Sequence, residues 1–281
     1  MPVVIASGNC RNRPPAARRS IRLEDRVMGA VLAMVARKGG VGKTSLCLHL
    51  ACHWAEEGLR VRLVDLDSQA SLSQACLGPE AVESLRPSDT VEAVLAGGPA
   101  EAVERPTRWE RVSLVPSSLG LRSPAVAAAV PELRSREAEL TILDTPPDTT
   151  GALVRAALLS ADFVLSPVDP EPFGAASVLS VLGLCQSVAM APNPGLSLLG
   201  FVVNRRERQT VHAVVEDALR RLHGEQILPV AIPALKDFRE AALAREPITR
   251  HAPRSKAASA VRDLAAEVLL RIERLAAKRA A

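Results

Sequence analysis

The segment Arg37-Lys38-Gly39-Gly40-Val41-Gly42-Lys43-Thr44-Ser45 constrains the fold of this chain more than any other feature. A short apolar run, residues 31–36, precedes it, and a helical pattern over residues 43–57 follows it and stops at Gly58. The apolar run is typical of a strand that is buried on both faces of a parallel sheet. The three glycines let the backbone wrap around an anion, with amides and a helix N-terminus directed at it. The segment therefore predicts a phosphate-binding loop between a strand and a helix.

The phosphate-loop motif predicts a nucleotide-binding role for each of its residues. Lys43 would neutralise charge on the β- and γ-phosphates of a nucleotide, and the Thr44 hydroxyl would ligate Mg²⁺. A Gly-rich turn with a coincidental Lys-Thr pair is the alternative, and the strand before the loop and the helix after it argue against that alternative. The predicted phosphate contacts are Gly39, Gly40, Val41, Gly42, Lys43, Thr44 and Ser45.

Further apolar runs along the chain each end at a polar or turn residue. They cover residues 61–66, 112–115, 140–143, 163–166, 198–203 and 227–232. Open α/β sheets bind their ligands at the carboxyl ends of the strands. The chain therefore predicts an α/β fold with a doubly wound, mostly parallel sheet and helices on both faces, and residues 256–278 have the spacing of an amphipathic helix that docks on it.

Length and composition favour a single cytoplasmic domain. With 281 residues, 48% of them hydrophobic, the chain is long enough for a single large α/β domain, which we assign to residues 28–281. Residues 1–27 carry six Arg, two acidic residues and no periodicity, which predicts a disordered basic extension or a stretch upstream of a start at Met28. No apolar run is long enough to cross a bilayer, so a cytoplasmic protein without a membrane partner is expected.

Cysteine and histidine spacing gives little support for a metal centre other than Mg²⁺. The five cysteines are odd in number, contain no C-x-x-C pair, and are expected to be reduced core thiols. His49 and His53 are four residues apart on the predicted helix, but the intervening Leu-Ala-Cys lacks the acidic residue of H-E-x-x-H. A core or surface position is therefore preferred for both.

The form K-G-G-V-G-K-T-S, with Arg37 where a first glycine is usual, resembles the deviant Walker A loop of the ParA/MinD family. The resemblance implies that Lys38 reaches across a dimer interface to the nucleotide of a second protomer. A second cation there would stabilise charge that develops on the γ-phosphate during transfer. The alternative is that Lys38 is a solvated loop charge.

Two strand ends resemble the other nucleotide motifs of this family. Asp65-Leu66-Asp67-Ser68-Gln69 matches D-x-D-x-Q, although Ser68 stands where proline is frequent. The match implies that Asp67 orients the attacking water and that Asp65 supports the metal site. Asp144, at the end of the run over residues 140–143, resembles the Walker B aspartate and would hold Mg²⁺ through water.

Two more strand ends correspond to base-contact positions in that family. Asn204 follows residues 198–203, and Pro233 follows residues 227–232. The resemblance implies that both contact adenine, and the alternative is that each only terminates its strand. The resemblance covers most of residues 28–281, including a C-terminal signature at residues 252–257, and is weakest over residues 116–139.

Charge is distributed unevenly along the chain. Residues 28–204 carry 13 basic and 19 acidic side chains, whereas residues 205–281 carry 16 basic and 10 acidic ones. A polyanion would therefore bind toward the C-terminal third, although a solvated charged face is the competing interpretation. The candidate DNA-binding residues are Arg205, Arg206, Arg208, Arg250, Arg254 and Lys256.

The resemblance predicts a weak ATPase with ATP and Mg²⁺ as cofactors. ATP would drive formation of a homodimer that binds double-stranded DNA non-specifically on the nucleoid, and hydrolysis stimulated by a ParB-like adaptor would reset it, for plasmid or chromosome segregation. Two alternatives come from other classes. A MinD-like membrane-associated positioning ATPase would need a C-terminal amphipathic anchor, for which residues 271–281 are poor material. An iron–sulfur carrier ATPase would need C-x-x-C cysteines, which the sequence lacks.

Overall fold

The computed structural model describes residues 29–122, 128–135, 137–172 and 174–280. The basic extension expected over residues 1–27, and Cys10 within it, lie outside these residues. Among the helices that the structure does describe, none is both long and apolar enough to cross a membrane.

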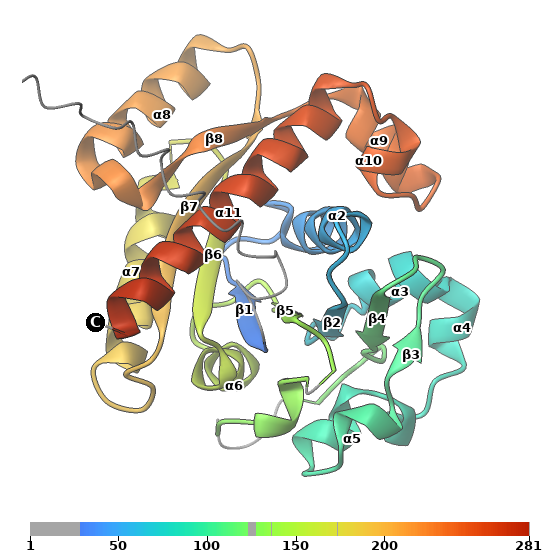
Figure 1. Ribbon diagram of the computed structural model, residues 1–281. Coiled ribbons are helices and arrows are strands. Elements are labelled where there is room, and N and C mark those ends of the chain that lie inside the picture. Colours follow the sequence, from blue (N-terminus) through green and yellow to red (C-terminus); the bar gives the residue numbers. More distant parts are fainter. Residues whose placement is uncertain (1–28, 123–127, 136, 173, 281) are drawn as a thin grey trace, which may run out of the picture.

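A single sheet of eight strands organises the described part of the chain (Figure 1). The strand order is β3-β4-β2-β5-β1-β6-β7-β8, and all neighbours are parallel except the short β3, which runs antiparallel to β4 at one edge. The strands are β1 (Ala30–Met34), β2 (Val61–Asp65), β3 (Arg105–Pro106), β4 (Val112–Val115), β5 (Leu140–Asp144), β6 (Phe163–Val168), β7 (Ser197–Arg206) and β8 (Ile227–Pro233). The predicted doubly wound, mostly parallel sheet is confirmed.

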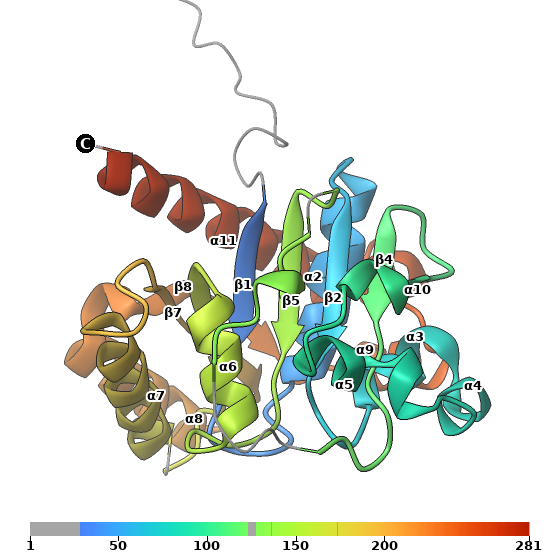
Figure 2. The same ribbon diagram turned by 90° about the horizontal axis from the view of Figure 1, so that it is seen from below.

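Both faces of the sheet are covered by helices, which explains why the strands read as continuous apolar runs. In β1, Leu32 and Met34 pack into the core cluster on one face, while Val31 and Ala33 pack into the cluster on the other. Figure 2 shows helices in front of and behind the strands. One face carries α2 (Lys43–Glu56), α3 (Ser71–Leu77), α9 (Lys236–Leu243), α10 (Ile248–His251) and α11 (Lys256–Ala280), and the other carries α5 (Val91–Leu95), α6 (Ala152–Ser160), α7 (Gly174–Ala189) and α8 (Thr210–His223). The short α4 (Pro79–Glu83) follows α3 at the margin.

The predicted strand over residues 163–166 is too short, and the reason is its position in the sheet. β6 continues through Pro167 to Val168, although proline removes a ladder donor. Leu165 faces β1, because its carbonyl accepts the Val35 amide, so Pro167 faces the same side two residues later. β1 pairs with β6 only as far as Leu165, so no described strand requires a donor from Pro167.

The four cysteines within the described residues are buried and unpaired, which confirms the expectation of core thiols. They are Cys47, Cys52, Cys76 and Cys185. The first three belong to the core cluster on the α2 face, and Cys185 belongs to the opposite cluster. Burial raises the pKa of Cys185 to about 12, so its thiol stays protonated at neutral pH.

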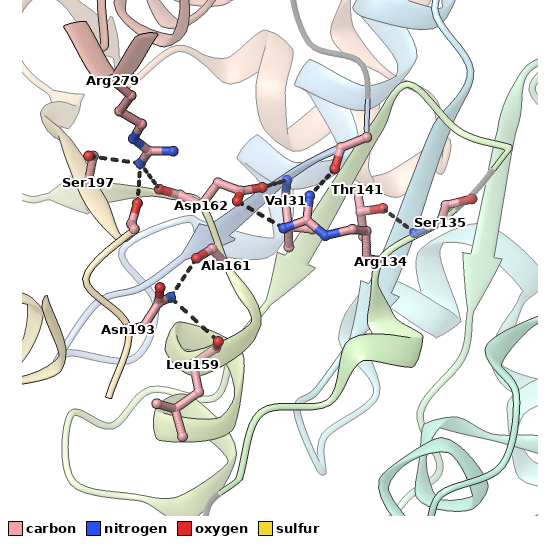
Figure 3. Close-up of polar contacts among 12 residues, drawn as sticks. Val31, Arg134, Ser135, Thr141, Leu159, Ala161, Asp162, Asn193, Ser197 and Arg279 are labelled. Atoms are coloured by element: carbon pink, nitrogen blue, oxygen red, sulfur yellow. Dashed lines mark hydrogen bonds and ion pairs between the residues drawn. The ribbon is translucent and has the colours of Figure 1, made fainter. Parts of the chain in front are cut away.

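Asp162, just before β6, makes hydrogen bonds to several elements at the amino ends of the parallel strands (Figure 3). Its carboxylate accepts the Val31 amide at 2.8 Å and a guanidinium N–H of Arg134 at 2.9 Å. Its carbonyl accepts the Ser197 amide and an N–H of Arg279, whose guanidinium also lies 4.9 Å from the centroid of the Phe163 ring. Asp162 therefore fixes the starts of β1, β6 and β7 and the last turn of α11 relative to one another.

We expect Asp162→Ala to lower the free energy of unfolding by about 2–3 kcal/mol, because it leaves the Val31 amide without its acceptor and removes the ion pair with Arg134. Urea unfolding followed by circular dichroism measures this loss. The matched control is Asp217→Ala, which removes an exposed i,i+4 ion pair with Arg221 on α8 and should cost under about 1 kcal/mol. Equal losses in the two variants would contradict the assigned role of Asp162.

Candidate nucleotide-binding site

The loop between β1 and α2 has the backbone geometry of a phosphate cradle. Gly40 and Gly42 adopt left-handed φ values of 75° and 92°, which side chains rarely tolerate. A Cβ on Gly42 would lie 2.3 Å from Nδ2 of Asn204, so the loop is also closely packed against the end of β7. α2 begins directly at Lys43, so its N-terminal amides face the loop.

A cavity of about 480 Å³ lies over this loop, within the size range of small-molecule sites. Six of the seven predicted phosphate contacts line it, together with Asp67 from the loop after β2 and Arg245 after α9. The seventh, Val41, is buried, and its carbonyl accepts Nδ2 of Asn204 at 2.6 Å. The six lining residues are Gly39, Gly40, Gly42, Lys43, Thr44 and Ser45.

Lys43 is a buried cation at the start of α2, with only 6% of its surface exposed. Burial lowers its pKa, and the negative charges of Asp144 and Asp67 act in the opposite direction. No hydrogen bond or ion pair to the Lys43 ammonium is found among the described residues. A buried ammonium facing a cavity is suited to binding an anion there.

Thr44 and Asp144 provide the oxygen atoms that a magnesium site needs. The Thr44 hydroxyl donates to Oδ2 of Asp144 at 2.7 Å. The other carboxylate oxygen, Oδ1 of Asp144, is buried and has no partner within the described part of the chain. Burial and the nearby charge of Asp65 raise the pKa of Asp144, which a bound cation would counteract. Hard oxygen ligands beside a phosphate site fit Mg²⁺.

Asp65 and Asp67 occupy different environments. Both Asp65 carboxylate oxygens are engaged within the chain: Oδ1 accepts the Asp67 amide, and Oδ2 accepts the amide and hydroxyl of Ser73 in α3. Burial raises the Asp65 pKa, and the Ser73 bonds partly offset this. Asp67 instead lines the cavity, and its Oδ1 accepts the Gln69 amide at 3.0 Å. Asp65 therefore holds the loop that carries Asp67, and the Asp67 carboxylate lies close enough to Lys43 for its charge to act on it.

Asn204 and Pro233 are brought together, as expected for neighbours at one edge of a parallel sheet. Both line a second hollow of about 340 Å³ beside Gly40 and Gly42. Phe238 of α9 and His49 of α2 also line it, with their ring centroids 5.5 Å apart. The hollow adjoins the phosphate loop, and apolar and aromatic side chains line it beside charged ones, so it can accept a flat heterocycle with polar edges.

Lys38 lies on the outside of the loop, 51% exposed, and contacts its own chain. Its Nζ donates to Oε2 of Glu171 at 2.5 Å and lies 4.0 Å from Oδ2 of Asp169. Arg205, in a left-handed backbone conformation, approaches the same Asp169 oxygen at 4.0 Å and donates to the Gly40 carbonyl at 2.9 Å. Asp169 and Glu171 were not anticipated from the sequence, because the strand before them was expected to end at residue 166.

The structure divides the six candidate DNA-binding residues by their partners. Arg205 is held at the phosphate loop, Arg206 pairs with Glu216 at 2.6 Å, and Arg250 pairs with Glu56 at 2.9 Å. The other three are exposed and have no hydrogen bond or ion pair within the described part of the chain; they are Arg208, Arg254 and Lys256. Lys256 lies beside Arg206 in a shallow hollow between β8 and α11.

The two histidines of α2, His49 and His53, have different partners. His49 is buried, and its Nδ1 accepts the Ile248 amide at 3.3 Å. His53 lies 4.0 Å from Glu56, three residues along the same helix. His49 therefore joins α2 to the start of α10 and lines both hollows of the site, a role that its spacing alone could not indicate.

Comparisons with known proteins agree with this geometry. The family model described as the CobQ/CobB/MinD/ParA nucleotide binding domain matches residues 32–248. The chain is 34% identical over 249 residues to a protein of Thermus thermophilus named chromosome-partitioning ATPase Soj, covering 86% of this chain and 96% of that protein.

Solved structures show the same fold. The cell division ATPase MinD of Pyrococcus furiosus superposes with a TM-score of 0.68 at 25% identity, covering 88% of this chain and 100% of that one. Cobyrinic acid a,c-diamide synthase from Mycobacterium smegmatis, with bound ADP and magnesium, gives 0.67 at 26% identity, covering 85% and 93%.

We expect His49 to make the fold sensitive to acid. Burial lowers its pKa from 6.5 to about 4, so the unfolded chain binds this proton first and stability is lost as pH falls from about 6.5 to about 4. His49→Gln keeps an acceptor for the Ile248 amide but does not titrate. The free energy of unfolding of the unmodified chain should fall up to about 3 kcal/mol further than that of His49→Gln across this range. Parallel pH profiles would contradict this assignment.

Proposed function

Because the chain belongs to the CobQ/CobB/MinD/ParA family of nucleotide-binding domains, we propose that it is a partition ATPase whose ATP-bound form is a DNA-binding dimer. The proposal assigns one ATPase domain to residues 28–281. The observation that carries it is the placement of two loop lysines with different freedom, the buried Lys43 facing the cavity and the half-exposed Lys38 outside it.

ATP with Mg²⁺ is the ligand that this site fits. The loop amides and Lys43 bind the triphosphate, and Asn204 and Pro233 border the hollow for adenine. Thr44 and Asp144 hold Mg²⁺, which neutralises phosphate charge when bound. Asp67 orients the attacking water from the loop after β2, and Asp65 supports it by fixing that loop through Ser73. Phosphoryl transfer needs positioning more than a strong base, which suits a carboxylate on a short, hydrogen-bonded loop.

Lys38 couples the nucleotide to assembly. In a dimer that buries two nucleotides face to face, Lys38 of each protomer reaches the phosphates bound by the other. ATP offers a γ-phosphate contact that ADP lacks, so the dimer is stabilised by ATP and lost on hydrolysis. A weak intrinsic rate keeps the dimer long-lived until a ParB-like adaptor stimulates hydrolysis.

The DNA contacts that we favour are the exposed cations Arg208, Arg254 and Lys256, because they have no partner among the described residues to give up. Phosphate contacts of this kind carry no sequence information. Dimerisation doubles their number, so DNA affinity rises steeply with ATP through avidity. The cargo is a plasmid or a chromosome, and the nucleoid is the expected location.

Binding to random duplex DNA should require ATP and should weaken steeply with salt. We expect tight binding with ATP and little with ADP or without nucleotide, measured by fluorescence anisotropy between about 50 and 200 mM salt. Lys43→Ala should abolish ATP binding and with it DNA binding. Nucleotide-independent DNA binding would contradict the proposal, and binding to anionic liposomes in place of DNA would favour a membrane-positioning ATPase.

The contact residues can be separated in the same assay. Arg254→Ala and Lys256→Ala should each reduce the steepness of the salt dependence in proportion to one lost phosphate contact per protomer. Arg250→Ala is the matched control, because Arg250 already pairs with Glu56. If Arg250→Ala reduced the salt dependence more than the other two variants, Arg254 and Lys256 would not be DNA contacts.

Asp67→Ala should trap the ATP-bound dimer. Without Asp67 the attacking water is not oriented, so we expect hydrolysis to fall by about 10²-fold or more while the dimer and its DNA complex persist. Phosphate release and size-exclusion chromatography with light scattering measure the two effects. Lys38→Ala is the opposite control, expected to bind ATP and remain monomeric. Rapid turnover by Asp67→Ala would remove Asp67 from this role.

A further inference from the structure

The acidic residues after β6 hold Lys38 inside its own protomer. The Lys38 ammonium donates to Glu171 at 2.5 Å and lies 4.0 Å from Asp169. Both carboxylates follow β6, which neighbours the β1 strand that leads into the loop. Lys38 is therefore already bound to a counter-ion in the isolated chain, on the outside of the cavity that faces the nucleotide.

We propose that Asp169 and Glu171 form a counter-ion site that retains Lys38 in its own protomer and so sets the ATP concentration at which two protomers associate. The proposal rests on the proposed function, because it concerns the lysine that reaches the partner's nucleotide. Each protomer must break its Lys38–Glu171 contact before the dimer forms, so the contact favours the monomer.

The two carboxylates are not equivalent. The Asp169 side chain is 8% exposed, and its Oδ1 is buried without a partner within the described residues. Its Oδ2 lies 4.0 Å from both Lys38 and Arg205. When Lys38 leaves, Arg205 remains as the counter-ion for Asp169. A buried carboxylate that keeps one cation costs far less than one that loses both.

Glu171 is the partner that can be released. Its side chain is 47% exposed, so water can solvate the carboxylate once Lys38 has moved. The contact with Lys38 lowers the Glu171 pKa, so the carboxylate is ionised while the pair is formed. A solvated glutamate is also ionised at neutral pH, so the charge persists after Lys38 leaves. The exchange therefore replaces an exposed ion pair by a contact between Lys38 and a phosphate.

Arg205 links this exchange to the loop. Its guanidinium donates to the Gly40 carbonyl while it lies near Asp169. Arg205 therefore holds the middle of the phosphate loop in place whether or not Lys38 occupies the counter-ion site. Within the counter-ion site, Arg205 is a positioning residue and Lys38 is the group that moves.

The exposure of the Lys38–Glu171 ion pair sets how much it can change the dimerisation constant. One half-exposed ion pair changes an equilibrium constant by roughly 1.5- to 5-fold. Two such pairs break for each dimer formed, so their removal should tighten dimerisation by roughly 2- to 25-fold. Salt screens exposed charges, so this gain should shrink between about 50 and 500 mM salt.

Glu171→Gln tests the proposal in the full-length protein. We measure the dimer fraction by sedimentation velocity while ATP is titrated, in the Asp67→Ala background so that hydrolysis does not interfere. We expect half-maximal dimerisation at lower ATP than in the parent, by roughly 1.5- to 5-fold, because two ATP molecules bind for each dimer formed. The two proteins should converge at high salt. Glu171→Asp, which keeps the charge, should restore the parent's behaviour in part.

The matched control is Asp217→Asn. Asp217 forms an exposed ion pair with Arg221 on α8 and lines neither the phosphate cavity nor the hollow for adenine. This variant changes the net charge equally and should leave the ATP threshold unchanged. Thermal unfolding of both variants checks that neither acts through the fold.

The outcomes separate the two proposals. A parent that stays monomeric at saturating ATP overturns both. A parent that dimerises while Glu171→Gln needs the same or more ATP overturns the counter-ion site alone. An equal shift in Asp217→Asn also overturns it, because the effect would then reflect net charge.

Discussion

The parallel alignment of β1 between β5 and β6 is the constraint on which the site depends. It brings the carboxyl ends of three strands to one edge, so that Thr44 after β1 lies 2.7 Å from Asp144 at the end of β5. The same alignment places Lys38 against the residues that follow β6. Residues 100 or more positions apart in the chain therefore meet without any contribution from a second domain.

Burial separates the two lysines of the loop into different functions. Lys43 is the first residue of α2 and is buried, so its ammonium faces the cavity and can contact little besides a ligand bound there. Lys38 lies five residues before α2 begins, in the turn, where half of its side chain is exposed to solvent. A fixed cation suits ground-state binding of phosphate, whereas a cation with exchangeable partners suits a switch.

The apolar runs located the ends of β2 and β5 to within one residue, and Asp67 and Asp144 lie at the cavity and the loop as expected. Asn204 also contacts the loop, although β7 continues past it to Arg206. Asp169 and Glu171 were missed because Pro167 was taken as a strand end. Whether a proline terminates a strand depends on whether a neighbour needs its donor, and that is a property of the sheet.

The sequence by itself determined the sheet class, the phosphate loop and the aspartates that accompany it, because glycine conformation, apolar runs and motif spacing are local properties. Tertiary structure decided which charges are free. Arg205, Arg206 and Arg250 look alike in sequence to Arg208 and Arg254, yet the first three are held by Gly40, Glu216 and Glu56. Side-chain pairing between distant segments depends on how strands and helices are ordered in space, and no local pattern encodes that order.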